Sequence, residues 1–227
     1  MGDFAIVAEG RTDQMVIKNV LLGIFADAND EPLVVFEQPL DDETGKAGTP
    51  SPGGWSQVIR YLREGKYREA LQTNGYLVVH IDSDVSEDYG VAKPDGHDPQ
   101  AMSEAVVAKL RELIDGDVLE AYGERIIFAV AVHSIECWLL PLLFPNKTAK
   151  RAKIMGCLDA ADNELGKRSE PRLKRGVDGK DPEGYRAASL PYTKRKTLEL
   201  HRDHNPSLGA FVRDVERRAI QIPTDNG

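Results

Sequence analysis

Four short apolar runs, separated by longer stretches with helical periodicity, constrain the fold of this 227-residue chain more than any other feature. The runs lie at residues 3–8, 33–37, 76–81 and 126–132. Each has the length and apolar content of a strand that is buried on both faces of a parallel sheet. Amphipathic stretches, the first at residues 12–28, separate the runs. This alternation predicts βαβ units, and hence an α/β fold with a mainly parallel four-stranded sheet flanked by helices.

The strand signal ends near Pro145, and the chain beyond it has a different character. We predict an α/β domain over residues 1–145 and a mostly helical, basic extension over residues 146–227. Within the extension, apolar spacing predicts helices at 147–166 and 205–220.

Charge is distributed unevenly along the chain. The formal net charge is −8, yet residues 147–202 carry 15 Lys and Arg against 8 Asp and Glu. A basic segment beside an acidic domain favours contact with nucleic acid, although a solvated helical face would show the same composition. Lys174 and Arg175, inside this segment, are candidate nucleic-acid contacts.

Acidic residues follow three of the four apolar runs. They are Glu9 after the first run, Asp82 and Asp84 after the third, and Glu136 after the fourth. In an open α/β sheet, ligands bind in the crevice beyond the carboxyl ends of the strands. Carboxylates gathered there would repel one another without a cation between them. The pattern therefore predicts one or two divalent ions, Mg²⁺ or Mn²⁺, because these ions suit oxygen ligands.

For Asp82, Asp84 and Glu136, a structural role is the alternative to metal binding. Asp82 and Asp84 are two residues apart, so in an extended chain they would face the same side and could share a metal ion. An Asx turn with a helix cap is the alternative for this pair. Glu136 is either a ligand of a second metal ion or a carboxylate placed at the positive end of its own helix.

The loop after the first run supplies three further candidates. Gly10 would let the chain turn beside a ligand without a Cβ in the way, or is a simple turn glycine. Arg11 is a candidate phosphate contact, or a solvated arginine. Asp13 is a candidate metal ligand, or a carboxylate in the first turn of a helix.

The remaining chemistry-bearing residues are expected to be structural. The five histidines show no zinc-binding spacing, and His80 and His133 lie on or beside strands, where core histidines are expected. Cys137 and Cys157 form no disulfide framework or zinc set and are expected to stay reduced in a cytoplasm. No signal peptide or membrane-spanning apolar stretch is visible, which predicts a cytoplasmic protein with no membrane partner.

Taken together, these motifs resemble the TOPRIM family, the catalytic module of topoisomerases, primases and OLD-type nucleases. The family pattern is a Glu-Gly pair after the first strand and an Asp-x-Asp after the third, which correspond here to Glu9-Gly10 and Asp82-Ser83-Asp84. The segment HSIECW at residues 133–138 is similar to the small stand-alone branch found near OLD nucleases and prokaryotic defence proteins. The resemblance covers residues 1–145.

The resemblance implies a Mg²⁺-dependent endonuclease that cleaves phosphodiester bonds in DNA or RNA with Glu9, Asp82 and Asp84. It also implies an effector role in anti-phage defence, with a separate ATPase chain because no Walker A sequence occurs. In OLD-type nucleases a lysine after the metal motifs stabilises the transition-state charge, a role for which Lys194 and Lys196 are the candidates. A topoisomerase or a primase is not expected, since no second large domain or zinc ribbon is visible.

Two other functions compete with the nuclease. One is a TOPRIM-like interaction module that binds metal or nucleotide without hydrolysis and partners an ATPase. The other is a receiver-like phosphoacceptor domain, which needs paired acids after the first strand, where this chain has only Glu9. A homo-oligomer is compatible with each of them.

Overall fold

The computed structural model describes residues 2–39, 54–94, 98–151, 155–176 and 179–222. Its main sheet has four parallel strands in the order β2-β1-β3-β4, which confirms the predicted α/β fold class. The strands are β1 (Gly2–Val7), β2 (Val34–Gln38), β3 (Asn74–Asp82) and β4 (Ile126–Ala131). Each lies within two residues of a predicted strand at either end.

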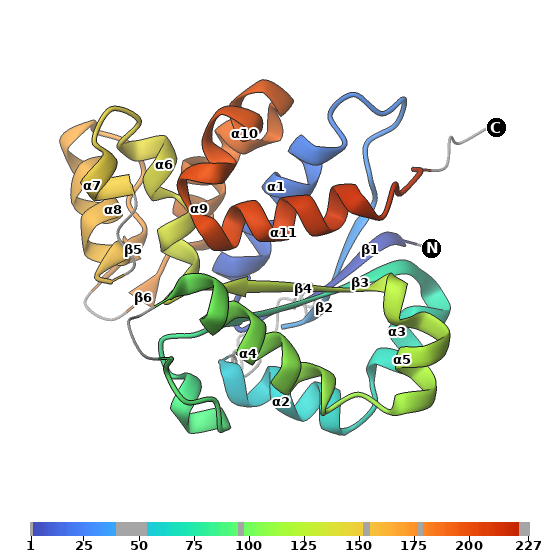
Figure 1. Ribbon diagram of the computed structural model, residues 1–227. Coiled ribbons are helices and arrows are strands. Elements are labelled where there is room, and N and C mark those ends of the chain that lie inside the picture. Colours follow the sequence, from blue (N-terminus) through green and yellow to red (C-terminus); the bar gives the residue numbers. More distant parts are fainter. Residues whose placement is uncertain (1, 40–53, 95–97, 152–154, 177–178, 223–227) are drawn as a thin grey trace.

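Helices cover both faces of the sheet, as Figure 1 shows. Helix α1 (Arg11–Ile24) packs on one face, because a right-handed crossover from β1 to β2 places it there. It ends four residues before the predicted boundary. The opposite face is covered by α2 (Trp55–Arg63), α3 (Tyr67–Thr73), α4 (Pro99–Arg111) and α5 (Gly116–Tyr122). Alternate strand residues serve the two faces, so Val78 packs toward α1 and Val79 packs away from it.

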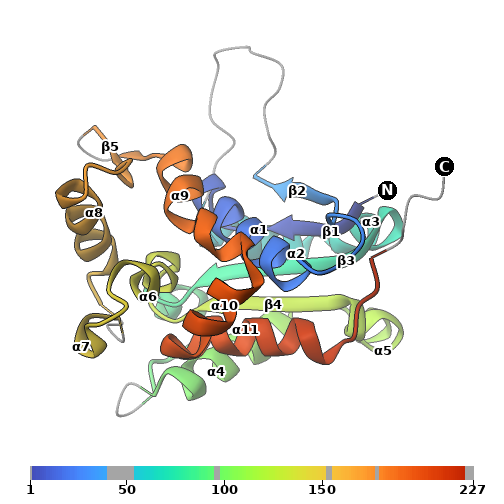
Figure 2. The same cartoon turned by 90° about the horizontal axis from the view of Figure 1, so that it is seen from above.

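The chain after β4 is built from short helices and one small hairpin. Beyond the carboxyl edge of the sheet lie α6 (Leu140–Leu143), α7 (Thr148–Arg151), α8 (Cys157–Lys167) and the antiparallel strands β5 (Lys174–Arg175) and β6 (Gly179–Lys180). Helices α9 (Pro182–Ser189) and α10 (Arg195–His201) pack against α1, and α11 (Pro206–Arg217) lies along β4 (Figure 2). Short 3-10 turns are η1 (Ser86–Tyr89), η3 (Gly123–Arg125), η4 (Ile135–Trp138), η5 (Leu190–Thr193) and η6 (Arg202–His204).

The C-terminal region shares a hydrophobic core with the first 145 residues. Tyr185, Tyr192 and Phe211 are buried in the same cluster as Phe4 and the apolar face of α1. Phe211 also stacks on Trp138, with ring centroids 5.5 Å apart. The helices of this region therefore complete the α1 face of the sheet.

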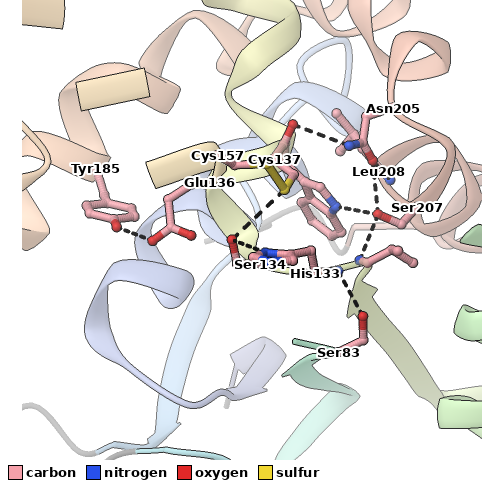
Figure 3. The surroundings of a disulfide bond; sticks show 12 residues. Ser83, His133, Ser134, Glu136, Cys137, Cys157, Tyr185, Asn205, Ser207 and Leu208 are labelled. Carbon is pink, nitrogen blue, oxygen red and sulfur yellow. Dashed lines mark hydrogen bonds between the residues drawn. A yellow bond between two sulfur atoms is a disulfide. The ribbon is translucent and has the colours of Figure 1, made fainter. Parts of the chain in front are cut away.

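Two expectations about the chain after β4 need correction. The predicted helix at 147–166 is divided into α7 and α8, and Gly156, in the left-handed conformation with φ 60°, immediately precedes α8. Cys137 and Cys157, which we expected to be reduced, are joined by a disulfide (Figure 3). The bond connects η4 to the first residue of α8, two elements that only the tertiary fold brings together. Separately, none of the helices in the described ranges has the length and apolar character needed to cross a membrane.

Candidate metal centre

The Glu9-Gly10 motif and the Asp82-Ser83-Asp84 motif meet at the carboxyl edge of the sheet, where β1 and β3 end. The chain leaves β1 toward β2 and leaves β3 toward β4, so these neighbouring strands form the topological switch point where such sheets bind ligands. Asp82 is the last residue of β3, and its backbone N–H donates a 2.7 Å hydrogen bond to Oε1 of Glu9. The structure thus brings together Glu9 and Asp82, as their positions in the sequence predicted.

Asp13 joins them from the first turn of α1 and is 3% exposed. The Thr12 hydroxyl lies 3.4 Å from Oδ1 of Asp13, and the backbone of Gly10 hydrogen-bonds to the same carboxyl group. Gly10 is extended, with φ −148°, so its conformation does not require glycine. A Cβ there would lie 3.3 Å from Oδ2 of Asp13, so Gly10 matters for space beside this carboxylate.

His80 lies on β3 two residues before Asp82, and both side chains therefore face α1. The ring is fully buried, with Nδ1 2.6 Å from the carbonyl oxygen of Ala129. Its Nε2 lies 3.3 Å from Oδ1 of Asp82, and neither atom has a hydrogen-bond partner in the described part of the chain. Ligand atoms of Asp13, His80 and Asp82 all lie within 4.8 Å of one another.

Sequence reasoning assigned His80 to the core and missed this position. The prediction of burial was correct, but the side chain is buried at the carboxylate cluster. The signal was present in the sequence as a histidine two residues before an aspartate at a strand end.

Burial and mutual repulsion hold the central carboxyl groups toward their protonated forms. Desolvation, followed by the charges of Asp82 and Asp13, raises the pKa of Glu9 to about 8. Desolvation also raises the pKa of Asp13, and desolvation with the neighbouring carboxylates raises the pKa of Asp82 well above its ordinary value. The cluster is therefore unfavourable as a set of bare anions.

Glu136, the second residue of η4, is 1% exposed and contacts Tyr185 and Lys180; Figure 3 shows the contact with Tyr185. Tyr185 donates its hydroxyl hydrogen to Oε1, and Nζ of Lys180 lies 2.7 Å from the same oxygen. Burial opposes the charge of Glu136, yet Lys180 and these hydrogen bonds hold its pKa below the ordinary value. Burial likewise opposes the charge of Lys180, but Glu136 and Asp13 raise its pKa. Glu136 thus holds a lysine at the edge of the cluster.

Asp84 takes a different position from the one we expected. Strand β3 ends at Asp82, so the alternation of faces stops there, and Asp84 is exposed in the turn before η1. Its backbone N–H donates to the carbonyl of His133 at 3.0 Å. Asp84, His133 and Met155 help to line a pocket of about 160 Å³ beside the cluster. Asp84 still contributes to the raised pKa of Asp82, but neither Asp84 nor Glu9 is in the closely spaced ligand group of Asp13, His80 and Asp82; Glu9 adjoins that group through the Asp82 amide.

The predicted lysines lie elsewhere. Lys194 and Lys196 flank Arg195, whose Nη1 donates 2.8 Å to the carbonyl of Ile24 at the end of α1. Asp13 is eleven residues earlier on α1, roughly 16 Å away along the helix axis. The structure does not bring these two lysines to the carboxylates; the lysine at the cluster is Lys180.

The candidate nucleic-acid contacts remain near this edge. Arg11 is exposed at the start of α1. Lys174 and Arg175 are exposed on β5, the strand paired with the one that carries Lys180. Nζ of Lys174 already lies 2.6 Å from Oδ1 of Asp159.

The chemistry of this donor set fits a divalent cation. Among the described residues, the cluster has four carboxyl groups, those of Glu9, Asp13, Asp82 and Glu136, and one ammonium group, that of Lys180. With all four carboxyl groups ionised and His80 neutral, three formal negative charges would stay uncompensated. Nε2 of His80 and Oδ1 of Asp82, which lie 3.3 Å apart, also lack a hydrogen-bond partner in the described ranges. No family model matches the chain, and no match was found among curated proteins or solved structures.

Proposed function

We propose that this chain is a metal-dependent nuclease that hydrolyses phosphodiester bonds in DNA or RNA. The observation that carries the proposal is the convergence of Glu9, Asp13 and Asp82 at the switch point, beside a lysine held by Glu136. An uncompensated acidic cluster with one cationic side chain suits charge neutralisation on a phosphoryl group.

The side chains of the cluster would have different roles in the reaction. Glu9, Asp13 and Asp82 would hold Mg²⁺ or Mn²⁺, which supplies Lewis acidity and a water of lowered pKa. Lys180 stays protonated beside the cluster, because Glu136 raises its pKa, and its ammonium offsets negative charge on the reacting phosphate. Tyr185 fixes Glu136, and Glu136 in turn positions Lys180.

The pocket at Asp84 and the basic residues around it define where a substrate would lie. Lys93 and His133 line the pocket with Asp84, and Lys174 and Arg175 are on the neighbouring hairpin. A polyanion along this edge would meet the positive charges of Lys93, Lys174 and Arg175, which favours nucleic acid as the substrate class.

A cleavage assay tests the proposal. Purified protein is incubated with supercoiled plasmid, linear DNA and tRNA, each with Mg²⁺, with Mn²⁺ or with a chelator. We expect metal-dependent cleavage of at least one substrate and its loss in Asp82→Asn. Lys180→Ala should lower the rate by about a hundredfold or more, the scale of losing one transition-state donor.

Lys196→Ala is the matched control, because Lys196 is an exposed lysine remote from the cluster. Full activity in Lys180→Ala with loss of activity in Lys196→Ala would contradict the assignment. Absence of cleavage of every substrate under both metals would contradict the nuclease.

The ion pair of Lys180 with Glu136 favours one alternative, since it neutralises part of the cluster without a metal ion. In this second proposal the chain is a TOPRIM-like module that binds metal or nucleotide without hydrolysis and partners an ATPase. Metal binding without cleavage, together with co-purification of an ATPase chain, would favour it. Either form is compatible with a role in anti-phage defence.

A further inference from the structure

We infer that His80 is itself a metal ligand, so that the centre is a mixed nitrogen and oxygen site that prefers Mn²⁺ or a later first-row divalent ion to Mg²⁺. The inference rests on the metal site of the proposed function, and it changes the expected metal. An all-carboxylate site would suit Mg²⁺.

The hydrogen bond at Nδ1 fixes which nitrogen of the His80 ring carries the hydrogen. Nδ1 of His80 lies 2.6 Å from the carbonyl oxygen of Ala129, which can only accept a hydrogen bond. Nδ1 therefore carries hydrogen, and in the neutral ring Nε2 presents a lone pair. Metal-binding histidines show this arrangement, in which a backbone carbonyl fixes the ring through the other nitrogen.

The lone pair on Nε2 of His80 faces a carboxylate oxygen. Nε2 is 3.3 Å from Oδ1 of Asp82, an acceptor, and both atoms are buried without a hydrogen bond to any described residue. Two buried acceptors facing each other are unfavourable unless a proton or a cation lies between them. A proton would satisfy His80 and Asp82 alone, whereas Asp13 also approaches the same point.

The spacing of the three side chains suits a single metal ion. Ligand atoms of Asp13, His80 and Asp82 lie within 4.8 Å of one another. Two oxygens on opposite sides of one small divalent ion are about 4.2 Å apart, so these side chains need only small movements to share an ion. Imidazole with two carboxylates favours transition ions, whose affinities rise along the series from Mn²⁺.

Pulsed EPR of the Mn²⁺-loaded protein tests the inference directly. We expect ¹⁴N modulation from a coordinated imidazole in the wild-type protein and its loss in His80→Gln. The glutamine replaces the ring nitrogen with an amide, so Mn²⁺ affinity by titration calorimetry should fall at least roughly tenfold. Mg²⁺ affinity should change less, so the preference for Mn²⁺ over Mg²⁺ should shrink.

Two matched controls accompany the measurement. His133→Gln removes the other histidine near the cluster, and His201→Gln makes the same substitution at a buried histidine of α10. Both should keep the ¹⁴N signal. If His80→Gln does not fold, His80→Asn and the wild-type spectrum still decide the question.

Absence of ¹⁴N modulation in the wild-type protein, or its persistence in a folded His80 variant, overturns the inference. The readout does not depend on catalysis. Nitrogen coordination without any nuclease activity would leave this site standing and defeat the proposed function. Cleavage with Mg²⁺ and no nitrogen signal would do the reverse.

Discussion

Asp162 and Asp82 are both buried, with 2% and 7% of their surface exposed, but their surroundings are opposite. Asp162, on α8, accepts hydrogen bonds from the Arg172 guanidinium and from the backbone N–H groups of Leu173 and Lys174, at 2.9 and 3.1 Å for the last two. The hydrogen bond from Arg172 and these amides hold its pKa below the ordinary value. Asp82 is buried among carboxylates, and its pKa is raised.

The comparison teaches that burial of a carboxylate does not by itself indicate function; its partners do. Asp162 has donors enough to stabilise its charge, so its role is to organise the segment after α8. Oδ1 of Asp82 accepts no hydrogen bond from the described residues and faces Nε2 of His80 at 3.3 Å, so the charge of Asp82 is disfavoured unless a proton or a cation compensates it.

The two regions are physically connected. Strand β5 supplies the Lys174 amide to Asp162, and its partner β6 carries Lys180, which reaches Glu136. The Cys137–Cys157 disulfide joins the residue after Glu136 to the start of α8 (Figure 3). A substitution in the Asp162 region should therefore alter the position of Lys180 beside the carboxylate cluster.

The sharpest test substitutes alanine at each aspartate. Asp162→Ala leaves the backbone amides of Leu173 and Lys174 without their acceptor, whereas the half-exposed Arg172 can be solvated, and it should lower the free energy of unfolding by about 3–4 kcal/mol. Asp82→Ala relieves repulsion and should leave the metal-free stability unchanged or higher. Urea denaturation in chelator measures both, and equal losses in the two variants would break the comparison.

Loss of the disulfide should have the next largest effect. The cysteines are 20 residues apart, so the loop-entropy model gives about 3 kcal/mol of stabilisation. Reduction of the wild-type protein with a dithiol should lower its thermal midpoint, and Cys137→Ser should show the lower midpoint with or without the dithiol. A wild-type midpoint that does not respond to reduction would contradict the link between the two regions.

The pH dependence of stability should have opposite signs in the two regions. The pKa of Glu9 is raised from 4.5 to about 8, so between these values the folded state holds a proton that the unfolded state has lost. Metal-free stability should therefore fall as pH rises through this window, by at most about 1.4 kcal/mol per pH unit for one proton. The raised pKa values of Asp13 and Asp82 act in the same direction, while Lys180 stays charged.

Asp162 acts the other way. Its pKa is lowered from 3.8, so its contribution is present above that value and is lost as the pH falls further. Denaturation curves from pH 3 to 9 in chelator should show both limbs, and Glu9→Gln should flatten only the upper one. Metal-free stability that increases from pH 5 to 8 would count against the cluster.

The smallest expected effect is on nucleic-acid binding by the hairpin. Replacing both Lys174 and Arg175 with Glu should weaken binding and flatten its salt dependence, by about 0.9 in the log–log slope for each phosphate of duplex DNA that the variant no longer neutralises. The Asp159 partner of Lys174 is exposed, so the stability cost should be small. Filter binding at several salt concentrations measures the slope, and an unchanged slope would remove this surface from the proposed substrate path.

The layers of the fold, and the proximity of Glu9 to Asp82, could be predicted from the pattern of residues along the chain. Periodicity identified the four strands, because residues two apart on a strand and three or four apart on a helix share an environment. Parallel strands deliver their carboxyl ends to one edge, so Glu9 and Asp82 had to lie near each other once the strand order was right.

The other residues of the site follow from the packing of whole elements and could not be predicted in this way. Lys180 lies at the cluster and Lys194 does not, because the β5–β6 hairpin and the packing of α9 and α10 along α1 set their positions. His80 became a candidate ligand because β3 ends at Asp82 and turns Asp84 outward. Contacts between residues 49 positions apart, such as Glu136 and Tyr185, or 170 positions apart, such as Asn19 and Ser189, leave no periodic trace in a sequence, since they depend on how whole elements pack.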